Sequence, residues 1–159
     1  MASAPLAEAQ VIEIIASEKR FVGDIRWEYD PVHNQTWAKF EKDVENVLGL
    51  NLVVYGNTSL VIEGKSSFSL VLNGNFRVFS LDVNGSHRNK HTDRNEWRGQ
   101  THKQRWTDIC RSGFAYTPNE PIPAEPNAAF CEFCRECNID FSGHIREVPS
   151  FQPALGESL

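Results

Sequence analysis

Residues 50–85, LNLVVYGNTSLVIEGKSSFSLVLNGNFRVFSLDVNG, decide the fold class of this chain. Apolar and polar residues alternate along four runs of this stretch, and turn-forming residues separate the runs. Alternation with a period of two is typical of β-strands that bury one face. Asn73 and Gly74 favour a tight hairpin turn, because both residues tolerate a positive φ. The stretch therefore predicts four antiparallel strands in a meander, in which residues 59–64 form a strand of their own.

The segments on either side of the meander add helices and short strands. Apolar residues recur at steps of three and four in residues 5–22, 35–48 and 128–139, which is the period of an amphipathic helix. Short apolar runs at 25–29 and 113–118 are candidate flanking strands. We therefore expect an α+β fold with two N-terminal helices, an antiparallel β-meander of four to six strands, and a C-terminal helix packed on the sheet.

Length and composition limit the alternatives. A chain of 159 residues with 40% hydrophobic content is long enough for one ordinary core, so residues 1–159 are expected to form a single domain. Residues 150–159 have little to bury and are expected to form a loosely ordered tail. The sequence contains neither a long apolar span nor a signal peptide pattern. We expect a cytoplasmic protein that does not bind membranes.

Charge is distributed unevenly along the chain. The formal net charge is −5, which would repel nucleic acid from the molecule as a whole. Residues 86–111, however, carry seven lysines and arginines against three acidic residues, a local charge of +4 that leaves −9 for the remainder. The positive charge is therefore concentrated on one segment, which also holds several histidines and tryptophans.

This basic segment has the parts for handling RNA. His87 and His102 titrate near neutral pH, as a general acid and base must. The neighbouring cations suit phosphate, and tryptophan rings can stack on bases. The candidate catalytic residues are His87, Arg88, His102, Lys103 and Arg105. The candidate nucleic-acid-binding residues are Arg94, Trp97, Arg98 and Trp106.

Two other interpretations of the basic segment stay open. It is equally consistent with a solvated loop whose charges satisfy one another, anchored to the core by Trp97 and Trp106. A metal site formed by His87, His91 and His102 is a weaker alternative, because no acidic pair with ligand spacing accompanies them and basic neighbours disfavour a cation. No cofactor is expected.

The cysteines invite a second metal hypothesis. CEFCRECNIDFSGH places Cys131, Cys134, Cys137 and His144 in a spacing that superficially suits zinc. The residues between the cysteines favour a helix, in which cysteines three residues apart lie near one face. Small buried thiols are therefore the preferred interpretation, zinc binding is a weak alternative, and a redox or regulatory thiol is the third.

Short motifs resemble known families. FRVFSLDVNGSHRN, followed by THKQRW and FCRECNI, resembles an uncharacterised family of small bacterial proteins in which a strand ending in Leu-Asp-Val leads to His-Arg-Asn. The segment is also similar to TumE-type toxins of toxin-antitoxin pairs, and that resemblance places Asp82, His87, Arg88, His102 and Lys103 at the matching positions. The order of elements resembles the RelE and barnase group of ribonucleases.

These observations lead to two functional hypotheses. The first is an RNA-binding protein of a toxin-antitoxin or mobile-element module, with metal-independent endoribonuclease activity as the candidate reaction. Its partners would be RNA or ribosome-associated RNA, and an antitoxin or other protein. The alternative is a non-enzymatic binding or inhibitor protein, of phage or anti-defence origin, that acts through an acidic surface.

Overall fold

The computed structural model describes residues 6–33, 35–85, 100–108 and 113–152. These residues form an α+β fold in which every strand joins one sheet. The helical elements are α1 (Glu8–Ala16), the 3-10 turn η1 (Pro31–His33) and α2 (Pro126–Glu136). The strands are β1 (Lys19–Phe21), β2 (Glu28–Tyr29), β3 (Trp37–Asn46), β4 (Leu52–Ser59), β5 (Ser66–Leu72), β6 (Phe76–Gly85), β7 (Gln100–Trp106), β8 (Gly113–Tyr116) and β9 (Ile139–Phe141).

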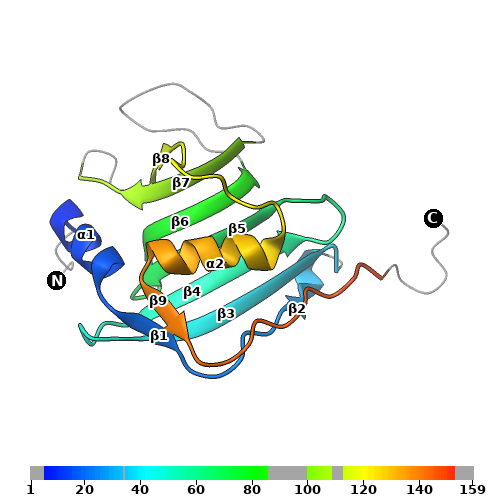
Figure 1. Cartoon of the computed structure of the whole chain (residues 1–159), viewed down its shortest axis with the longest axis horizontal. Coiled ribbons are helices and arrows are strands. Elements are labelled where there is room, and N and C mark those ends of the chain that lie inside the picture. Colours follow the sequence, from blue (N-terminus) through cyan, green and yellow to red (C-terminus); the bar gives the residue numbers. More distant parts are fainter. Residues whose placement is uncertain (1–5, 34, 86–99, 109–112, 153–159) are drawn as a thin grey trace.

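The sheet has nine strands, which is more than the four to six expected. Its order is β8-β7-β6-β5-β4-β3-β1-β9, and β2 also pairs with β3. Strands β3 to β8 follow one another as an antiparallel meander, whereas β9 returns from α2 to lie parallel to β1. Figure 1 shows α2 lying across one face of this sheet. The α+β class and the packing of the later helix on the sheet are therefore confirmed.

The helix expected over residues 35–48 is wrong, because β3 occupies this part of the chain. Burial along β3 alternates with a period of two: Ala38, Phe40 and Val44 are buried, whereas Lys39, Glu41, Asp43 and Glu45 are exposed. Eight residues of β3 pair with β4. The apolar spacing fits both a helix and a strand, and pairing with a neighbouring strand decides for the strand.

Two other expected elements also differ. The strand expected at 59–64 is a turn, because the Ser59 hydroxyl accepts hydrogen bonds from the backbone N–H groups of Val61 (3.3 Å) and Ile62 (2.9 Å). This local bonding closes the β4–β5 hairpin and leaves both aliphatic side chains about half exposed. The first helix ends at Ala16 instead of continuing to residue 22, and the chain then enters β1.

The core lies between the sheet and α2. Phe130 and Phe133 of α2 pack against Phe68 of β5, with ring centroids 5.2 and 6.1 Å apart. Gly56 of β4 makes room for the Phe40 ring, since a Cβ at this position would lie 2.2 Å from the ring carbon Cε1. Aromatic packing of this kind fixes how α2 sits on the sheet. The opposite face of β3 and β4 carries the outward-facing residues.

Lys19 joins the ends of both helices. Its ammonium group is buried and donates to the carbonyls of Ile15 (3.1 Å), Ser17 (2.7 Å) and Cys137 (2.7 Å). These carbonyls end α1 and α2, where the helix dipole favours a positive charge. Burial lowers the pKa of Lys19 to about 8. No helix among the described residues is long and apolar enough to cross a membrane.

Candidate functional site

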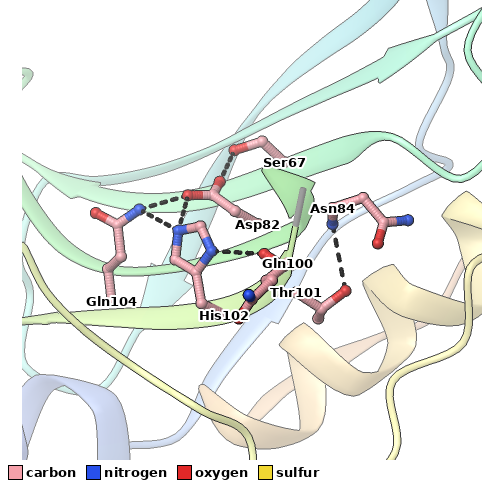
Figure 2. A network of polar contacts seen from close by, with 7 residues as sticks. All are labelled: Ser67, Asp82, Asn84, Gln100, Thr101, His102 and Gln104. Atoms are coloured by element: carbon pink, nitrogen blue, oxygen red, sulfur yellow. Dashed lines mark hydrogen bonds and ion pairs between the residues drawn. The ribbon is translucent and has the colours of Figure 1, made fainter. Parts of the chain in front are cut away.

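A polar cluster lies near the end of β6 and the start of β7. Asp82 of β6 is directly opposite His102 of β7 and Ser67 of β5. One carboxylate oxygen of Asp82 accepts a hydrogen bond from the Ser67 hydroxyl (2.5 Å), and the other lies 3.1 Å from Nε2 of His102. Gln104 also donates its amide N–H to Asp82. Figure 2 shows Asp82 at the centre of these contacts. We call this group the Asp82–His102 clasp.

The backbone around the clasp is adapted to it. The β6–β7 pairing shifts register between Asp82 and Gly85. Within this bulge Asn84 adopts a φ of 55°, a conformation that asparagine tolerates better than most residues. Its backbone N–H donates to the Thr101 hydroxyl (3.2 Å), and its side chain donates to the Gly64 carbonyl (2.8 Å). The bulge therefore binds β6 both to β7 and to the β4–β5 turn.

The surroundings of His102 favour a charged ring. Its Nδ1 lies 2.8 Å from the carbonyl oxygen of Gln100, which can only accept, so Nδ1 carries a proton. Its Nε2 faces the Asp82 carboxylate, so a proton on Nε2 is favoured as well. The Gln104 amide nitrogen lies 3.2 Å from Nε2 and can donate to it when the ring is neutral. The clasp thus accommodates both forms and prefers the imidazolium.

The pKa values of the pair follow from these contacts. Burial disfavours the charge on His102, but the hydrogen bonds to Asp82 and to the Gln100 carbonyl outweigh it and raise the pKa of His102 above its usual value. Burial also disfavours the charge on Asp82, and the hydrogen bonds from His102 and Ser67 outweigh it and lower the pKa of Asp82. Each residue therefore stabilises the charged form of the other.

Burial limits what His102 can do chemically. Its side chain is 0% exposed, and the Asp82 side chain is 15% exposed. A general acid or base must reach the proton that it transfers, directly or through one water. In this arrangement the His102 ring faces protein groups, and the clasp holds β5, β6 and β7 together.

Two of the cations predicted to surround His102, Lys103 and Arg105, lie on the other face of the sheet. Side chains alternate along β7, so that Lys103 and Arg105 point away from the face that carries His102 and Gln104. Lys103 is buried and forms ion pairs with Glu120 and with Glu136 (3.1 Å). Burial opposes this charge, but the two carboxylates raise the pKa of Lys103. Lys103 therefore joins β7 to the end of α2.

The predicted stacking residue Trp106 is also buried. Its indole N–H donates to the Leu6 carbonyl (3.0 Å), and its ring packs edge-on against Phe76 with centroids 5.7 Å apart. Trp106 thus anchors the chain before α1 to the sheet. The remaining predicted RNA-handling residues lie outside the described residues; they are His87, Arg88, Arg94, Trp97 and Arg98. His91 and Cys110 lie outside them too.

Among the described residues, the cysteines of α2 and its C-cap are not arranged as a metal site. Cys131 is exposed, whereas Cys134 and Cys137 are buried, and burial raises the pKa of each of the two buried thiols. A raised pKa disfavours the thiolate that a metal needs. Across the described parts of the chain, no group of three or more histidine, cysteine or acidic side chains, His144 included, is arranged to hold a metal ion.

A second candidate site is the outward side of β3. The helix expected over residues 35–48 did not predict this site. Glu41, Asp43 and Glu45 occupy successive outward positions of this strand and are exposed. Glu45 forms an ion pair with Arg20 of β1 (2.9 Å), whereas Glu41 and Asp43 form none with the described residues. We call these three residues the acidic row. In the sequence KFEKDVE, residues 39–45, an acidic residue stands at every second position from Glu41 onward. Recognising this stretch as a strand would have predicted the row.

Neutral side chains lie beside the acidic row on the same face of the sheet. Val53 and Tyr55 of β4 are directly opposite Asp43 and Glu41, and Val71 of β5 follows Val53. All three neutral residues are half-buried. The face therefore has an apolar and aromatic middle with carboxylates along one side.

Comparison with known proteins adds no relative to this description. No protein-family model matches the chain, and neither a curated protein nor a solved structure matches it.

Proposed function

We propose that this protein is a non-enzymatic binding protein that docks a basic partner protein on the face formed by β3, β4 and β5. The observation that carries the proposal is the acidic row, in which Glu41 and Asp43 have no cation among the described residues as partner. Side chains two positions apart on a strand are about 7 Å apart, so these charges repel one another. A basic partner would relieve that repulsion.

The composition of the face supports a protein as the partner. Stable interfaces place aromatic and aliphatic side chains in the middle and charged residues at the rim. Tyr55, Val53 and Val71 correspond to such a middle, and the acidic row corresponds to one rim. Complementary rim charges raise the association rate and select the partner, and their effect weakens as salt increases.

The burial of His102, Lys103 and Trp106 also favours binding over catalysis. His102 is enclosed in the clasp, and Lys103 is neutralised by two carboxylates on the opposite face. Neither side chain is free to hold phosphate in this arrangement. Binding of a partner protein is compatible with the positions of both side chains in the structure.

The test is co-purification from the source cell with matched variants. Wild-type protein should retain a basic protein in a 1:1 complex, and the triple variant E41Q/D43N/E45Q should lose it. The control E13Q/E63Q/E147Q removes the same charge from exposed positions elsewhere and should retain the partner. Equal loss in both triple variants, or no 1:1 partner for the wild type, would overturn the proposal.

RNA cleavage is the second candidate function, and one observation favours it. The clasp joins the end of β6 to the start of β7, and the sequence between these two strands, residues 86–99, carries Arg88, Lys90, Arg94 and Arg98. Labelled RNA incubated with the wild type in a metal chelator tests this role. Cleavage that disappears in H87A supports it; intact RNA after incubation with the wild type contradicts it.

A further inference from the structure

The pairing along the outer edge of β3 is interrupted in its middle. β1 pairs with β3 at Asn46 and Glu45, and β2 pairs with it at Lys39 and Ala38. Figure 1 shows the chain leaving β3 after β1 and returning to it at β2. Residues 40–44 therefore lack a neighbouring strand on this side among the described residues. We call this interruption the β3 gap.

The C-terminal part of the chain holds the intervening segment away from β3. The N–H of Ile25 donates to the His144 carbonyl (3.0 Å), and the Ile25 carbonyl accepts from Arg146 (2.9 Å). Asp24 also accepts from the His144 N–H (3.0 Å) and forms an ion pair with Arg146 (2.7 Å). Since these groups of Asp24 and Ile25 are already bonded, they are not available to β3.

The contacts at both ends of β3 show which backbone groups face the gap. The backbone N–H of Val47 donates to the Glu18 carbonyl on the β1 side. The backbone carbonyl of Trp37 accepts from the N–H of Asp30 on the β2 side. Because backbone groups alternate in direction along a strand, Glu41 and Asp43 point their N–H and C=O groups to this same side. Neither residue has a backbone partner there among the described residues.

The gap is accompanied by a surface pocket of about 480 Å³. Its walls are formed by Val22, Glu41, Lys42, Asp43 and Glu45. The Lys42 ammonium donates to the Asp24 carbonyl (3.1 Å), which ties it to the intervening segment. Val22 is 56% exposed. The pocket thus combines the acidic row, one aliphatic side chain and an unpaired stretch of backbone.

We infer that the β3 gap binds a short extended segment of the basic partner, with lysine or arginine at alternate positions. An extended backbone supplies both the acceptors that the two N–H groups need and the donors that the two carbonyls need. Side chains directly opposite each other on paired strands lie close together, so basic residues at positions i and i+2 would meet Glu41 and Asp43. This inference rests on the proposed function and adds the form of the partner.

The probe for this inference is the peptide acetyl-Gly-Arg-Val-Arg-Gly-amide, titrated into ¹⁵N-labelled protein. The amide signals of Glu41 and Asp43 should shift and their hydrogen exchange should slow. A peptide of the same sequence with methylated backbone nitrogens keeps both charges but cannot donate. Loss of two hydrogen bonds should weaken its binding about thirtyfold.

The outcomes separate this inference from the proposed function. Equal binding of the two peptides, or unchanged amide signals of Glu41 and Asp43, would overturn the inference. If E41Q/D43N/E45Q still loses the 1:1 partner in that case, the acidic row remains a docking surface without strand addition. Loss of the partner in the control triple variant would instead overturn the proposed function.

Discussion

Replacing Asp82 with asparagine should destabilise the protein strongly and reverse its pH dependence. The replacement keeps the size of the side chain but leaves the charged His102 ring, which is 0% exposed, without its anion. Removing one partner of a buried ion pair costs about 3–5 kcal/mol, and the 15% exposure of Asp82 places the expected loss at about 3 kcal/mol.

The sign of the pH dependence follows from the two pKa shifts. The raised pKa of His102 gives stability that is complete below its unfolded pKa of about 6.5 and is lost as pH rises through the folded pKa. The lowered pKa of Asp82 gives stability that is present above about pH 4 and is lost as pH falls through its folded value. The clasp therefore contributes most between about pH 4 and 6.5. In D82N burial acts on His102 without the carboxylate, so stability should rise from pH 5 to pH 8.

Urea unfolding followed by tryptophan fluorescence at pH 5, 6, 7 and 8 measures both effects. D140N removes an exposed carboxylate from β9 and serves as the control, with an expected change below about 0.5 kcal/mol. A loss below about 1 kcal/mol for D82N, or a pH slope equal to that of the wild type, would refute the assignment of a charged pair.

Three further predictions concern other parts of the structure. D43N removes the repulsion of Asp43 by Glu41 and Glu45, which is about 0.6 kcal/mol for each pair in water and roughly half of that at physiological salt. The variant should therefore raise the free energy of unfolding by about 0.5 kcal/mol. A decrease in urea unfolding would argue against an unsatisfied acidic row. Because burial lowers the pKa of Lys19 to about 8, the unfolded state binds more protons at Lys19 between pH 8 and 10. The stability of the wild type relative to K19M, measured by urea unfolding, should therefore rise over that range; the comparison cancels the buried thiols of Cys134 and Cys137, whose raised pKa values act in the opposite direction, and a constant difference would contradict the burial of this ammonium group. G56A would place a Cβ 2.2 Å from the Phe40 ring and should cost about 2–3 kcal/mol, and an unchanged melting temperature would contradict the packing of that ring over β4.

The sequence by itself determined the α+β class, most of the meander and the presence of a later helix, expected at residues 128–139 and found at 126–136. The sequences of β5 and β6 largely alternate apolar and polar residues on either side of an Asn-Gly turn, and these local signals act over a few residues. Asp82 and His102 could likewise be selected as candidates, because residue type and the short motifs around them are visible in the chain. The burial of Lys103 could not be foreseen, since Glu120 and Glu136 are distant in sequence.

Only the tertiary structure decided β3 and, with it, the acidic row. The apolar residues between 37 and 48 fit a helix by their spacing, and pairing with β4 across eight positions selected the strand. It also decided that His102 and Lys103 would point to opposite faces, because adjacent residues of a strand alternate. Local periodicity specifies which residues can share a face, but long-range pairing determines which periodicity the chain adopts and what each face meets.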